Sequence, residues 1–222
     1  MVKAIIFDFW GTLVENGVFP SPVRQVQMIL GLEMPFHEYV VCFEEAFMVQ
    51  GFDDLYEAFE NVCNAFGIIP EKWRLDKLVG MWNRHKFYAK PFPETIKVLE
   101  GLKGRYKLVL LSNTDCFSVD ELLDKYNLRN FFDSVILSYK EGKLKTNQEL
   151  FKKALEGIGL SSEEVLMVGD SLESDIRAAE QAGIEAVLVD RRDRREYPQK
   201  IRTLEELEEV LLISNGQDNK TP

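Results

Sequence analysis

The chain has 222 residues, 45% of them hydrophobic, which suits one large domain or a domain with a substantial insertion. Its formal net charge of −10 argues against a surface made for nucleic acid or for anionic membranes. No apolar stretch approaches the roughly 18–20 residues that span a bilayer, and the N-terminal apolar run lacks the pattern of a secretion signal. Three widely spaced cysteines favour a reduced, cytoplasmic compartment over a disulfide framework or a zinc site. The two histidines, His37 and His85, lack a Cys or His partner at ligand spacing and are expected to be surface or core residues.

The first predicted element is a strand over residues 4–7. This apolar, partly β-branched run ends abruptly in Asp8, and Gly11 and Thr12 follow within four positions. A carboxylate at that point lies at the carboxyl edge of the sheet, where open α/β sheets bind ligands. Taken alone, Asp8 is equally consistent with a turn residue that accepts backbone N–H bonds.

Residues 15–90 carry no strand pattern, and their apolar residues recur at helical spacing. The predicted helices cover 22–31, 35–50, 53–66 and 71–88, with Pro and Gly at their boundaries. We expect a small helical cap with its own core, inserted after the first strand. Its aromatic residues are expected to be mainly core rather than pocket lining; they are Phe36, Tyr39, Phe43, Phe47, Trp73 and Trp82. The segments Glu15–Pro20 and Lys90–Pro93 are the expected hinges.

From residue 91 the pattern alternates between helix and strand. Strands are predicted at 106–112, 134–138, 164–169 and 185–190, with helices at 94–103, 118–127, 147–158 and 174–182. Capping-box pairs predict three helix starts, at Ser118–Glu121, Thr146–Glu149 and Thr203–Glu206. Such alternation indicates right-handed βαβ units and a parallel sheet covered on both faces. The prediction is therefore an α/β, Rossmann-like core of residues 1–14 and 91–213, an all-helical cap of residues 15–90, and a flexible tail of residues 214–222.

Polar residues stand where four of these strands end. Asp8 follows the first strand, Ser112 and Asn113 the second, and Asp170 with Asp175 the fourth, while Lys145 precedes the helix after the third. Carboxylates packed at one edge repel each other. A hard cation with oxygen ligands, such as Mg²⁺, relieves the repulsion, and the lysine and helix N-termini suit a phosphate group.

These segments resemble, in order, the four motifs of the haloacid dehalogenase-like (HAD) hydrolase superfamily, with a cap inserted after the first. The matching stretches are Phe7–Leu13 (FDFWGTL), Leu111–Asn113, Lys145, and Val168–Ser171 followed by Asp175. Thr146 stands where the family usually has proline after the lysine. The resemblance spans the whole predicted core.

The resemblance implies a role for each residue. Asp8 would be the nucleophile of a phosphatase, forming an aspartyl-phosphate. The implied ligands of Mg²⁺ are Asp8, the backbone carbonyl of Trp10, Asp170 and Asp175. The residues implied to contact a small phosphorylated substrate are Gly11, Thr12, Ser112, Asn113 and Lys145. Two alternatives stay open: Asp175 as a helix cap and Ser112 as a turn residue.

Trp10 is a departure from the family pattern. HAD phosphatases normally have a second Asp at this position, which protonates the leaving group and then activates water. Because such proton transfer is worth roughly 10²–10⁴-fold, alkyl phosphates should suffer most and aryl or acyl phosphates least. Glu15 and Asp115 are close enough in sequence to replace the acid, but both are expected to be solvated loop carboxylates. The charged run Arg191–Glu196 is compatible with an ordinary solvated surface.

Two other functions remain open. The 2-haloacid dehalogenases resemble the chain in having an aromatic residue two positions after the nucleophile, and they act on halogenated substrates without metal. They typically lack the Gly-Asp pair of the fourth motif, which this chain keeps as Gly169 and Asp170, so phosphoryl transfer is favoured. The third possibility is a catalytically weakened HAD fold that binds or regulates a partner; Trp10 supports it, whereas Asp8 and Lys145 oppose it.

Overall fold

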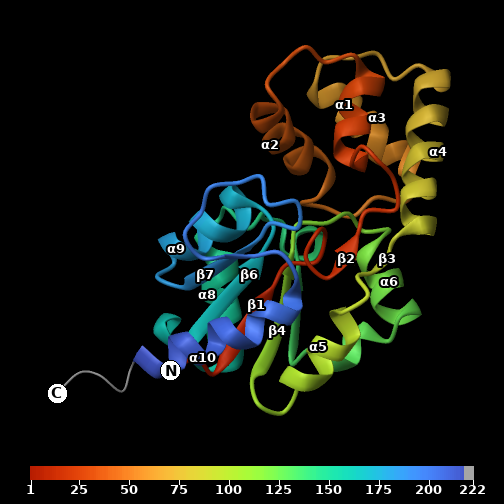
Figure 1. The fold of residues 1–222 in the computed structure, drawn as a ribbon. Helices are drawn as coiled ribbons and strands as arrows, with labels where there is room; N and C mark the ends of the chain where they lie inside the picture. The colour runs from red at the N-terminus through yellow and green to blue at the C-terminus, as the bar shows by residue number, and fades with distance from the viewer. Residues whose placement is uncertain (218–222) are drawn as a thin grey trace.

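A six-stranded parallel sheet forms the centre of the molecule. The computed structural model describes residues 1–217 and orders the strands β5-β4-β1-β6-β7-β8 (Figure 1). Their bounds are β1 Ala4–Phe7, β4 Lys107–Ser112, β5 Ser134–Leu137, β6 Val165–Gly169, β7 Glu185–Val189 and β8 Lys200–Ile201. All neighbouring pairs are parallel, which confirms the predicted α/β sheet. The sequence prediction missed β8, whose two residues are too short for a periodic signal.

Strand β1 occupies the interior of the sheet and sets the position of Asp8. All four of its residues are fully buried, as expected for a strand with helices on both faces. Phe7 pairs with Leu110 of β4 and with Val168 of β6. The polar residues that follow these three strands therefore emerge side by side at one edge of the sheet.

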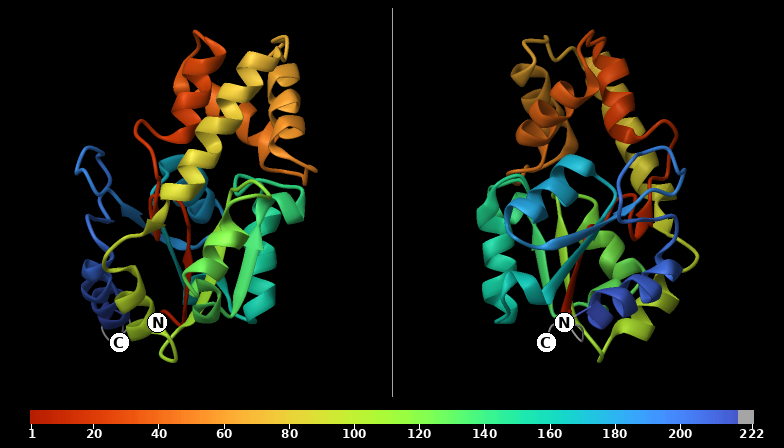
Figure 2. Two further views of the ribbon diagram at one scale, coloured as in Figure 1. Left: turned by 90° about the vertical axis from the view of Figure 1, so that its right-hand side faces the viewer. Right: turned by 60° about the vertical axis from the view of Figure 1, so that its left-hand side comes forward.

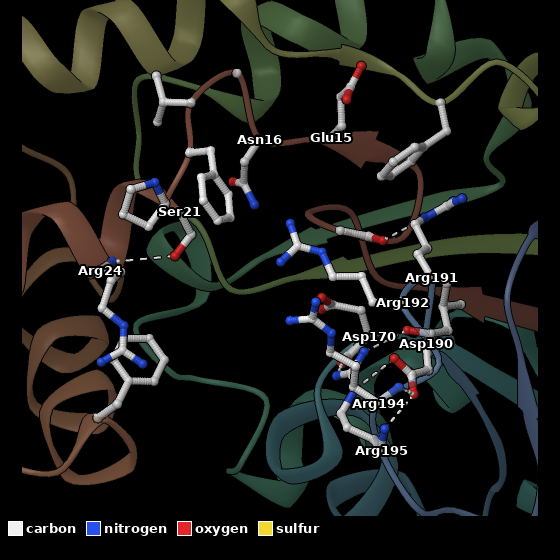
Figure 3. A pocket seen from close by; sticks show the side chains of 18 residues that line it. Glu15, Asn16, Ser21, Arg24, Asp170, Asp190, Arg191, Arg192, Arg194 and Arg195 are labelled. Atoms are coloured by element: carbon white, nitrogen blue, oxygen red, sulfur yellow. Dashed lines mark hydrogen bonds and ion pairs between the residues drawn. The ribbon is translucent and has the colours of Figure 1, made fainter.

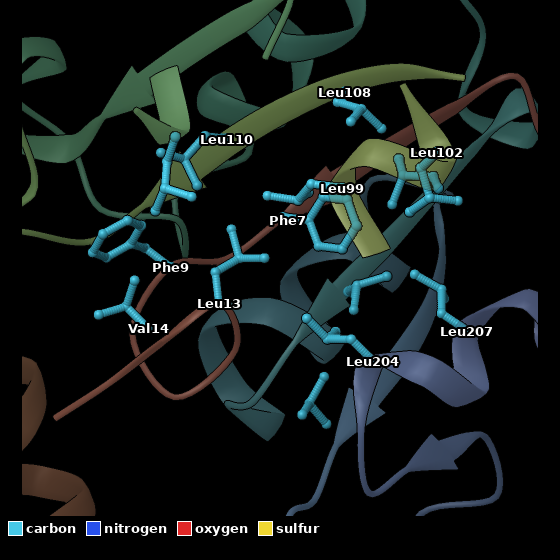
Figure 4. Close-up of a cluster of buried hydrophobic side chains, with 14 of the residues drawn as sticks. Phe7, Phe9, Leu13, Val14, Leu99, Leu102, Leu108, Leu110, Leu204 and Leu207 are labelled. Atoms are coloured by element: carbon cyan, nitrogen blue, oxygen red, sulfur yellow. The ribbon is translucent and has the colours of Figure 1, made fainter. Parts of the chain in front are cut away.

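The two faces of the sheet have separate hydrophobic clusters. Ile5 and Phe7 point to the face covered by α5 (Thr95–Leu102), α6 (Val119–Lys125) and α10 (Leu207–Gln217). Figure 4 shows Phe7 in this cluster with Leu99 and Leu102 of α5 and Leu207 of α10. Ala4 and Ile6 point to the face covered by α8 (Gln148–Ile158) and α9 (Ala178–Gln181). This alternation is the period of two expected of a strand, and it holds the strand ends rigidly between two packed layers.

Four helices lie over the carboxyl ends of the strands (Figures 1 and 2). They are α1 Pro22–Leu30, α2 Phe36–Phe47, α3 Leu55–Ala65 and α4 Lys72–Tyr88, within a residue or a few of the predicted bounds. They share a third hydrophobic cluster in which Tyr39, Phe43, Phe47 and Trp82 are buried, as predicted. Trp73 instead is 56% exposed, so its assignment to the core was wrong. We refer to α1–α4 as the cap.

Two short strands connect the cap to the sheet. β2 (Val14–Glu15) and β3 (Lys90–Pro91) pair antiparallel, and Lys90 lies 3.3 Å from Glu15. These strands overlap the expected hinges. The domain boundaries and the hinge motion stay predictions.

The helix starts were predicted with mixed success. Thr203 and Glu206 form the expected capping box, ahead of the turn η4 (Leu204–Glu206) that leads into α10. The pair Thr146–Glu149 was wrong, because Asn147 is the residue whose side chain accepts the Glu149 N–H, at 3.0 Å. Ser118 does precede α6, but its hydroxyl donates to Asp115 instead of capping the helix.

The remaining elements are short. They are α7 Ser138–Glu141, the 3₁₀ turns η1 Leu128–Phe131 and η2 Ser162–Glu164, and the π-helical turn η3 Leu172–Arg177, which precedes α9. The predicted helix at 174–182 is thus two pieces. Residues 214–217 belong to α10, so the predicted tail was wrong there, and its residues 218–222 lie outside the described part of the chain. Within residues 1–217, no helix has the length and apolarity needed to cross a membrane.

Candidate active site

A buried lysine joins two of the predicted site carboxylates. Nζ of Lys145 lies 2.6 Å from Oδ1 of Asp8 and also forms an ion pair with Asp175. The side chains of Lys145 and Asp8 are only 2% and 6% exposed. Burial would disfavour all three charges, but the two carboxylates raise the pKa of Lys145, so the lysine stays protonated. The structure therefore brings Asp8, Lys145 and Asp175 together, as the sequence predicted from three separate strand ends.

The nucleophile candidate is held through both carboxylate oxygens. Lys145 contacts Oδ1, and the Thr12 hydroxyl donates to Oδ2 at 3.0 Å. Burial raises the pKa of Asp8 to about 6, because the favourable charge of Lys145 only partly offsets the loss of water and the nearby charge of Asp175. Asp8 is thus mainly ionised at neutral pH, as a nucleophile must be. Thr12 acts on Asp8 and does not line the adjoining cavity.

Asp170 completes a cluster of three carboxylates. Asp8, Asp170 and Asp175 each offer an oxygen, and these oxygens lie within 4.8 Å of one another. Lys145 and a backbone N–H bind Asp175, whereas no donor among residues 1–217 bonds to the carboxylate of Asp170. Burial and the charges of Asp8 and Asp175 raise the pKa of Asp170 well above its usual value. An uncompensated carboxylate of this kind fits a divalent cation with oxygen ligands.

Gly11 allows this cluster to form. The residue has a φ of +77°, and a Cβ atom there would lie 2.3 Å from Oδ2 of Asp170. Only glycine therefore permits both the turn after β1 and the close approach of Asp170. The carbonyl oxygen of Trp10, one residue earlier, accepts no backbone hydrogen bond within residues 1–217, which leaves it available to a cation.

Asn113 connects the sheet edge to the cap. Its Oδ1 accepts the backbone N–H of Lys145 at 2.8 Å, and its Nδ2 donates to Oε2 of Glu44, on α2, at 2.9 Å. Ser112 lies apart from this network: it is fully buried, its hydroxyl is 3.4 Å from the carbonyl of Asn113, and it does not line the cavity.

The site opens into a cavity of about 230 Å³ between the sheet edge and the cap. Asp8, Trp10, Asn113, Lys145, Asp170 and Asp175 line it from the core side. One stripe of α2 lines it from the cap, at Phe36, Val40 and Glu44, and Met48, which directly follows the helix, continues the spacing of four residues that keeps side chains on one face. Trp82 and His85 of α4 also line the cap side, as do Pro22 and Val23 of α1, and the ring of His85 lies 4.7 Å from that of Trp10. Two predicted core aromatics, Phe36 and Trp82, thus also border the cavity.

A second cavity of about 920 Å³ lies beside the first and shares Asn16, Ser21, Phe36 and Asp170 with it (Figure 3). Its other side chains include five arginines, in a chain whose net charge is −10; they are Arg24, Arg191, Arg192, Arg194 and Arg195. The cavity therefore offers positive charge next to the carboxylate cluster.

Arg191, the first residue of the charged run Arg191–Glu196, is half-buried and contacts the turn after Asp8. Its guanidinium donates to the carbonyls of Gly11 and Thr12, at 3.1 and 2.7 Å, and lies 2.7 Å from Glu94. It thereby fixes the turn that follows Asp8. The guanidinium of Arg195 similarly donates to the carbonyl of Asp170.

The two carboxylates considered as substitute acids differ. Glu15 is half-buried and paired with Lys90. Asp115 is 1% exposed, so the expectation of a solvated loop residue was wrong; its Oδ1 accepts the N–H of Phe117 and the hydroxyl of Ser118. Sequence reasoning missed Glu44 altogether. The only available signal was the helical phase that places it four residues after Val40.

The chain belongs to the haloacid dehalogenase-like hydrolases, since the description of that family matches residues 2–183. Among its relatives, a glyceraldehyde 3-phosphate phosphatase of Methanothermobacter thermautotrophicus is 32% identical over 85% of this chain and 86% of its own. A phosphoglycolate phosphatase of Aquifex aeolicus is 27% identical over 84% of each chain. The crystal structure of a HAD phosphatase from Thermococcus onnurineus, 26% identical, covers 95% of this chain and 98% of its own with a TM-score of 0.63.

Proposed function

We propose that this hydrolase is a Mg²⁺-dependent phosphatase of small phosphate monoesters that forms an aspartyl-phosphate at Asp8. The observation that carries the proposal is the carboxylate of Asp170, which lies beside Asp8 and Asp175 without any donor among the described residues. Displacement of halide from carbon requires no third carboxylate here. A cation bound by Asp8, Asp170 and the carbonyl of Trp10 would offset their charge and polarise the phosphoryl oxygens.

The side chains support a two-step displacement. In the first step, the Asp8 carboxylate attacks phosphorus and the bond to the leaving oxygen breaks. Lys145 and Asn113, which lie beside Asp8, would hold phosphoryl oxygens, and the hydrogen bond from Thr12 would orient Asp8. In the second step, water attacks the aspartyl-phosphate, releases phosphate and restores Asp8.

The proposed substrates are small and anionic. The relatives named above act, by their names, on glyceraldehyde 3-phosphate and phosphoglycolate, both small phosphate monoesters. A cavity of about 230 Å³ beside an arginine-lined one suits a compact anion. A cytoplasmic location remains part of the proposal, supported by the three free cysteines.

A dehalogenase acting on 2-haloacids is the second candidate, favoured by one observation, the aromatic ring of Trp10 in the cavity. The experiment that separates the two measures phosphate release from p-nitrophenyl phosphate and halide release from a 2-chloroalkanoic acid. Each assay is run with Mg²⁺ and with excess chelator.

We expect Mg²⁺-dependent phosphate release that Asp8→Asn abolishes and that the exposed-site control Asp53→Asn leaves unchanged. Loss of turnover in Asp8→Asn would also exclude a purely binding role. Halide release that persists in chelator, without phosphate release, would contradict the phosphatase.

A further inference from the structure

We propose that Glu44, on the cap helix α2, is the general acid that protonates the leaving oxygen, in place of the carboxylate that Trp10 lacks. The inference rests on the proposed phosphatase function and deepens it. An alkoxide is a poor leaving group, so cleavage of an alkyl phosphate needs a proton donor in the cavity. Trp10 has no acidic proton to give, so the donor must come from elsewhere.

The position of Glu44 meets the geometric requirement. Among the cavity-lining residues of α2, it is the one ionisable side chain; the others are Phe36 and Val40, and Met48 follows the helix. Its Oε2 accepts a hydrogen bond from Asn113, which in turn binds the backbone of Lys145, whose Nζ contacts Asp8. Three successive contacts thus connect the cap carboxyl to the nucleophile across a single cavity. Glu44 faces that cavity from the side opposite the sheet edge, from which the nucleophile acts.

The electrostatic surroundings suit an acid that works near neutral pH. Burial raises the pKa of Glu44 to about 7, and the charges of Asp8 and Asp175 raise it as well. Lys145 and the hydrogen bond from Asn113 act in the opposite direction but do not outweigh burial. Both protonation states of Glu44 are therefore populated near pH 7, the condition under which one carboxyl can give a proton and then take one back. A phosphate dianion in the cavity would favour the protonated form further.

The other titratable groups that line the cavity are less suitable. Asp115 has its Oδ1 occupied by the N–H of Phe117 and the hydroxyl of Ser118, which makes it a structural anchor of its own loop. His85 is buried, its Nδ1 has no partner among residues 1–217, and burial lowers its pKa to about 4, so at neutral pH the ring is uncharged and is not an effective acid. The remaining groups, on the core side, are Asp8, Lys145, Asp170 and Asp175, which have the roles described above.

The proton balance follows from these roles. As Asp8 attacks, the electron pair of the breaking P–O bond passes to the leaving oxygen, which takes the proton of Glu44 and departs as an alcohol. The Glu44 carboxylate then accepts a proton from the water that attacks the aspartyl-phosphate. Phosphate leaves, Asp8 is free, and Glu44 is protonated again. Glu44 therefore touches the leaving group directly and is a catalytic residue.

The test compares leaving groups in Glu44→Gln, with Glu45→Gln as the matched control because Glu45 is the exposed neighbour on the same helix. We expect kcat/KM for glycerol phosphate to fall by about 10²–10⁴-fold in Glu44→Gln, whereas p-nitrophenyl phosphate, whose leaving group needs no proton, changes by less than about tenfold. The control should change neither. In the unmodified protein, activity on glycerol phosphate should fall above about pH 7, because Glu44 then loses its proton. The residual activity of Glu44→Gln should not show this fall.

An equal loss on both substrates would overturn the proposal and leave Glu44 as a positioning residue for Asn113. Unchanged activity on both substrates would also overturn it, and a selective loss in Asp115→Asn alone would move the role to Asp115. Thermal unfolding checks that each variant folds; should Glu44→Gln fail to fold, Glu44→Asp, with a shorter reach, is expected to give the same selective loss. An unmodified protein that releases no phosphate from either substrate would contradict the phosphatase function itself, a result distinct from these outcomes.

Discussion

Neutralising Asp170 should stabilise the metal-free protein while it removes the proposed cation site. The carboxylate of Asp170 lies near Asp8 and Asp175, accepts no hydrogen bond from residues 1–217, and has a raised pKa. When folding raises the pKa of a carboxyl group, the group destabilises the folded state at any pH above its pKa in the unfolded state. Asp170→Asn keeps the shape of the side chain and removes the charge, so the free energy of unfolding in chelator should rise.

The structure sets the size of this effect. At a separation of 4.8 Å and an effective dielectric constant of about 20, two carboxylates repel each other by about 3.5 kcal/mol. Asp170 has two such neighbours, and the positive charges of Lys145 and Arg195 oppose the repulsion. We therefore expect a net gain of about 1–3 kcal/mol in Asp170→Asn. For a chain of this length each kcal/mol raises Tm by roughly 2–4 °C.

The assay is thermal unfolding in chelator and in excess Mg²⁺. In chelator, Asp170→Asn should unfold at a higher temperature than the unmodified protein. Added Mg²⁺ should stabilise the unmodified protein, by about 2.7 kcal/mol at a concentration 100 times Kd, and should have little effect on the variant. Phosphatase activity should be largely lost in Asp170→Asn.

The matched control is Glu173→Gln, a nearby carboxylate that is 64% exposed and, among residues 1–217, forms an ion pair with Arg177 alone. Its substitution should change stability by no more than about 0.5 kcal/mol in either solution. A lower Tm for Asp170→Asn in chelator would refute the reasoning, because it would mean that the carboxylate is already compensated within the protein. An equal response of both proteins to Mg²⁺ would refute the assignment of Asp170 as a ligand.

Two further substitutions test other parts of the site. Arg191→Met removes the donors to the carbonyls that follow Asp8 and leaves Glu94, 11% exposed, without its ion-pair partner. We expect a loss of about 2–4 kcal/mol in urea unfolding and a lower kcat. The control is Arg202→Met, because Arg202 is exposed and lines neither cavity. A loss equal to that of the control would show that Arg191 does not hold the loop. His85 has a folded pKa of about 4, so its contribution is fully present above the unfolded pKa of about 6.5 and is lost as the pH falls toward 4. Between pH 7.5 and pH 4 the free energy of unfolding, measured from urea midpoints, should therefore fall by up to about 3 kcal/mol less in His85→Leu than in the unmodified protein. The control is His37→Leu, at an exposed position, which should not reduce this fall. Identical pH profiles for both variants would contradict the burial argument.

The sequence predicted the core half of the site because the geometry of a parallel sheet is local and repetitive. An apolar run that ends in a polar residue locates a strand end, and parallel strands place their ends along one edge. That rule alone predicts that Asp8, Asn113, Lys145 and Asp170 lie close together at this edge. The same rule wrongly placed Ser112 at the site, whereas its side chain is buried outside the cavity. Alternation along β4 does not specify which of the polar side chains at the end of the strand faces the cavity.

The cap half of the site was not predictable in the same way. Periodicity predicts the four helices of the cap. The face of α2 that meets the sheet edge, however, depends on how the cap packs on the core, and a local sequence pattern carries no information about that packing. Glu44 and Glu45 are adjacent and chemically identical in the sequence, and only the packing distinguishes the half-buried residue that lines the cavity from the exposed one. Arg191 was missed for a related reason: a run of charged residues predicts a solvated surface unless one member reaches a distant turn.

Trp10 has a physical consequence beyond the loss of a carboxyl group. A further carboxylate at this position would add to a cluster that already holds Asp8, Asp170 and Asp175 around one lysine. The indole ring instead gives one wall of the cavity an aromatic surface together with the ring of His85, and burial is the main cause of the raised pKa of Glu44. The replacement thus avoids further repulsion at the sheet edge. Since nucleophile and acid then lie on opposite sides of the cavity, proton transfer requires α2 to be seated over the sheet edge, whereas cleavage of an aryl phosphate does not.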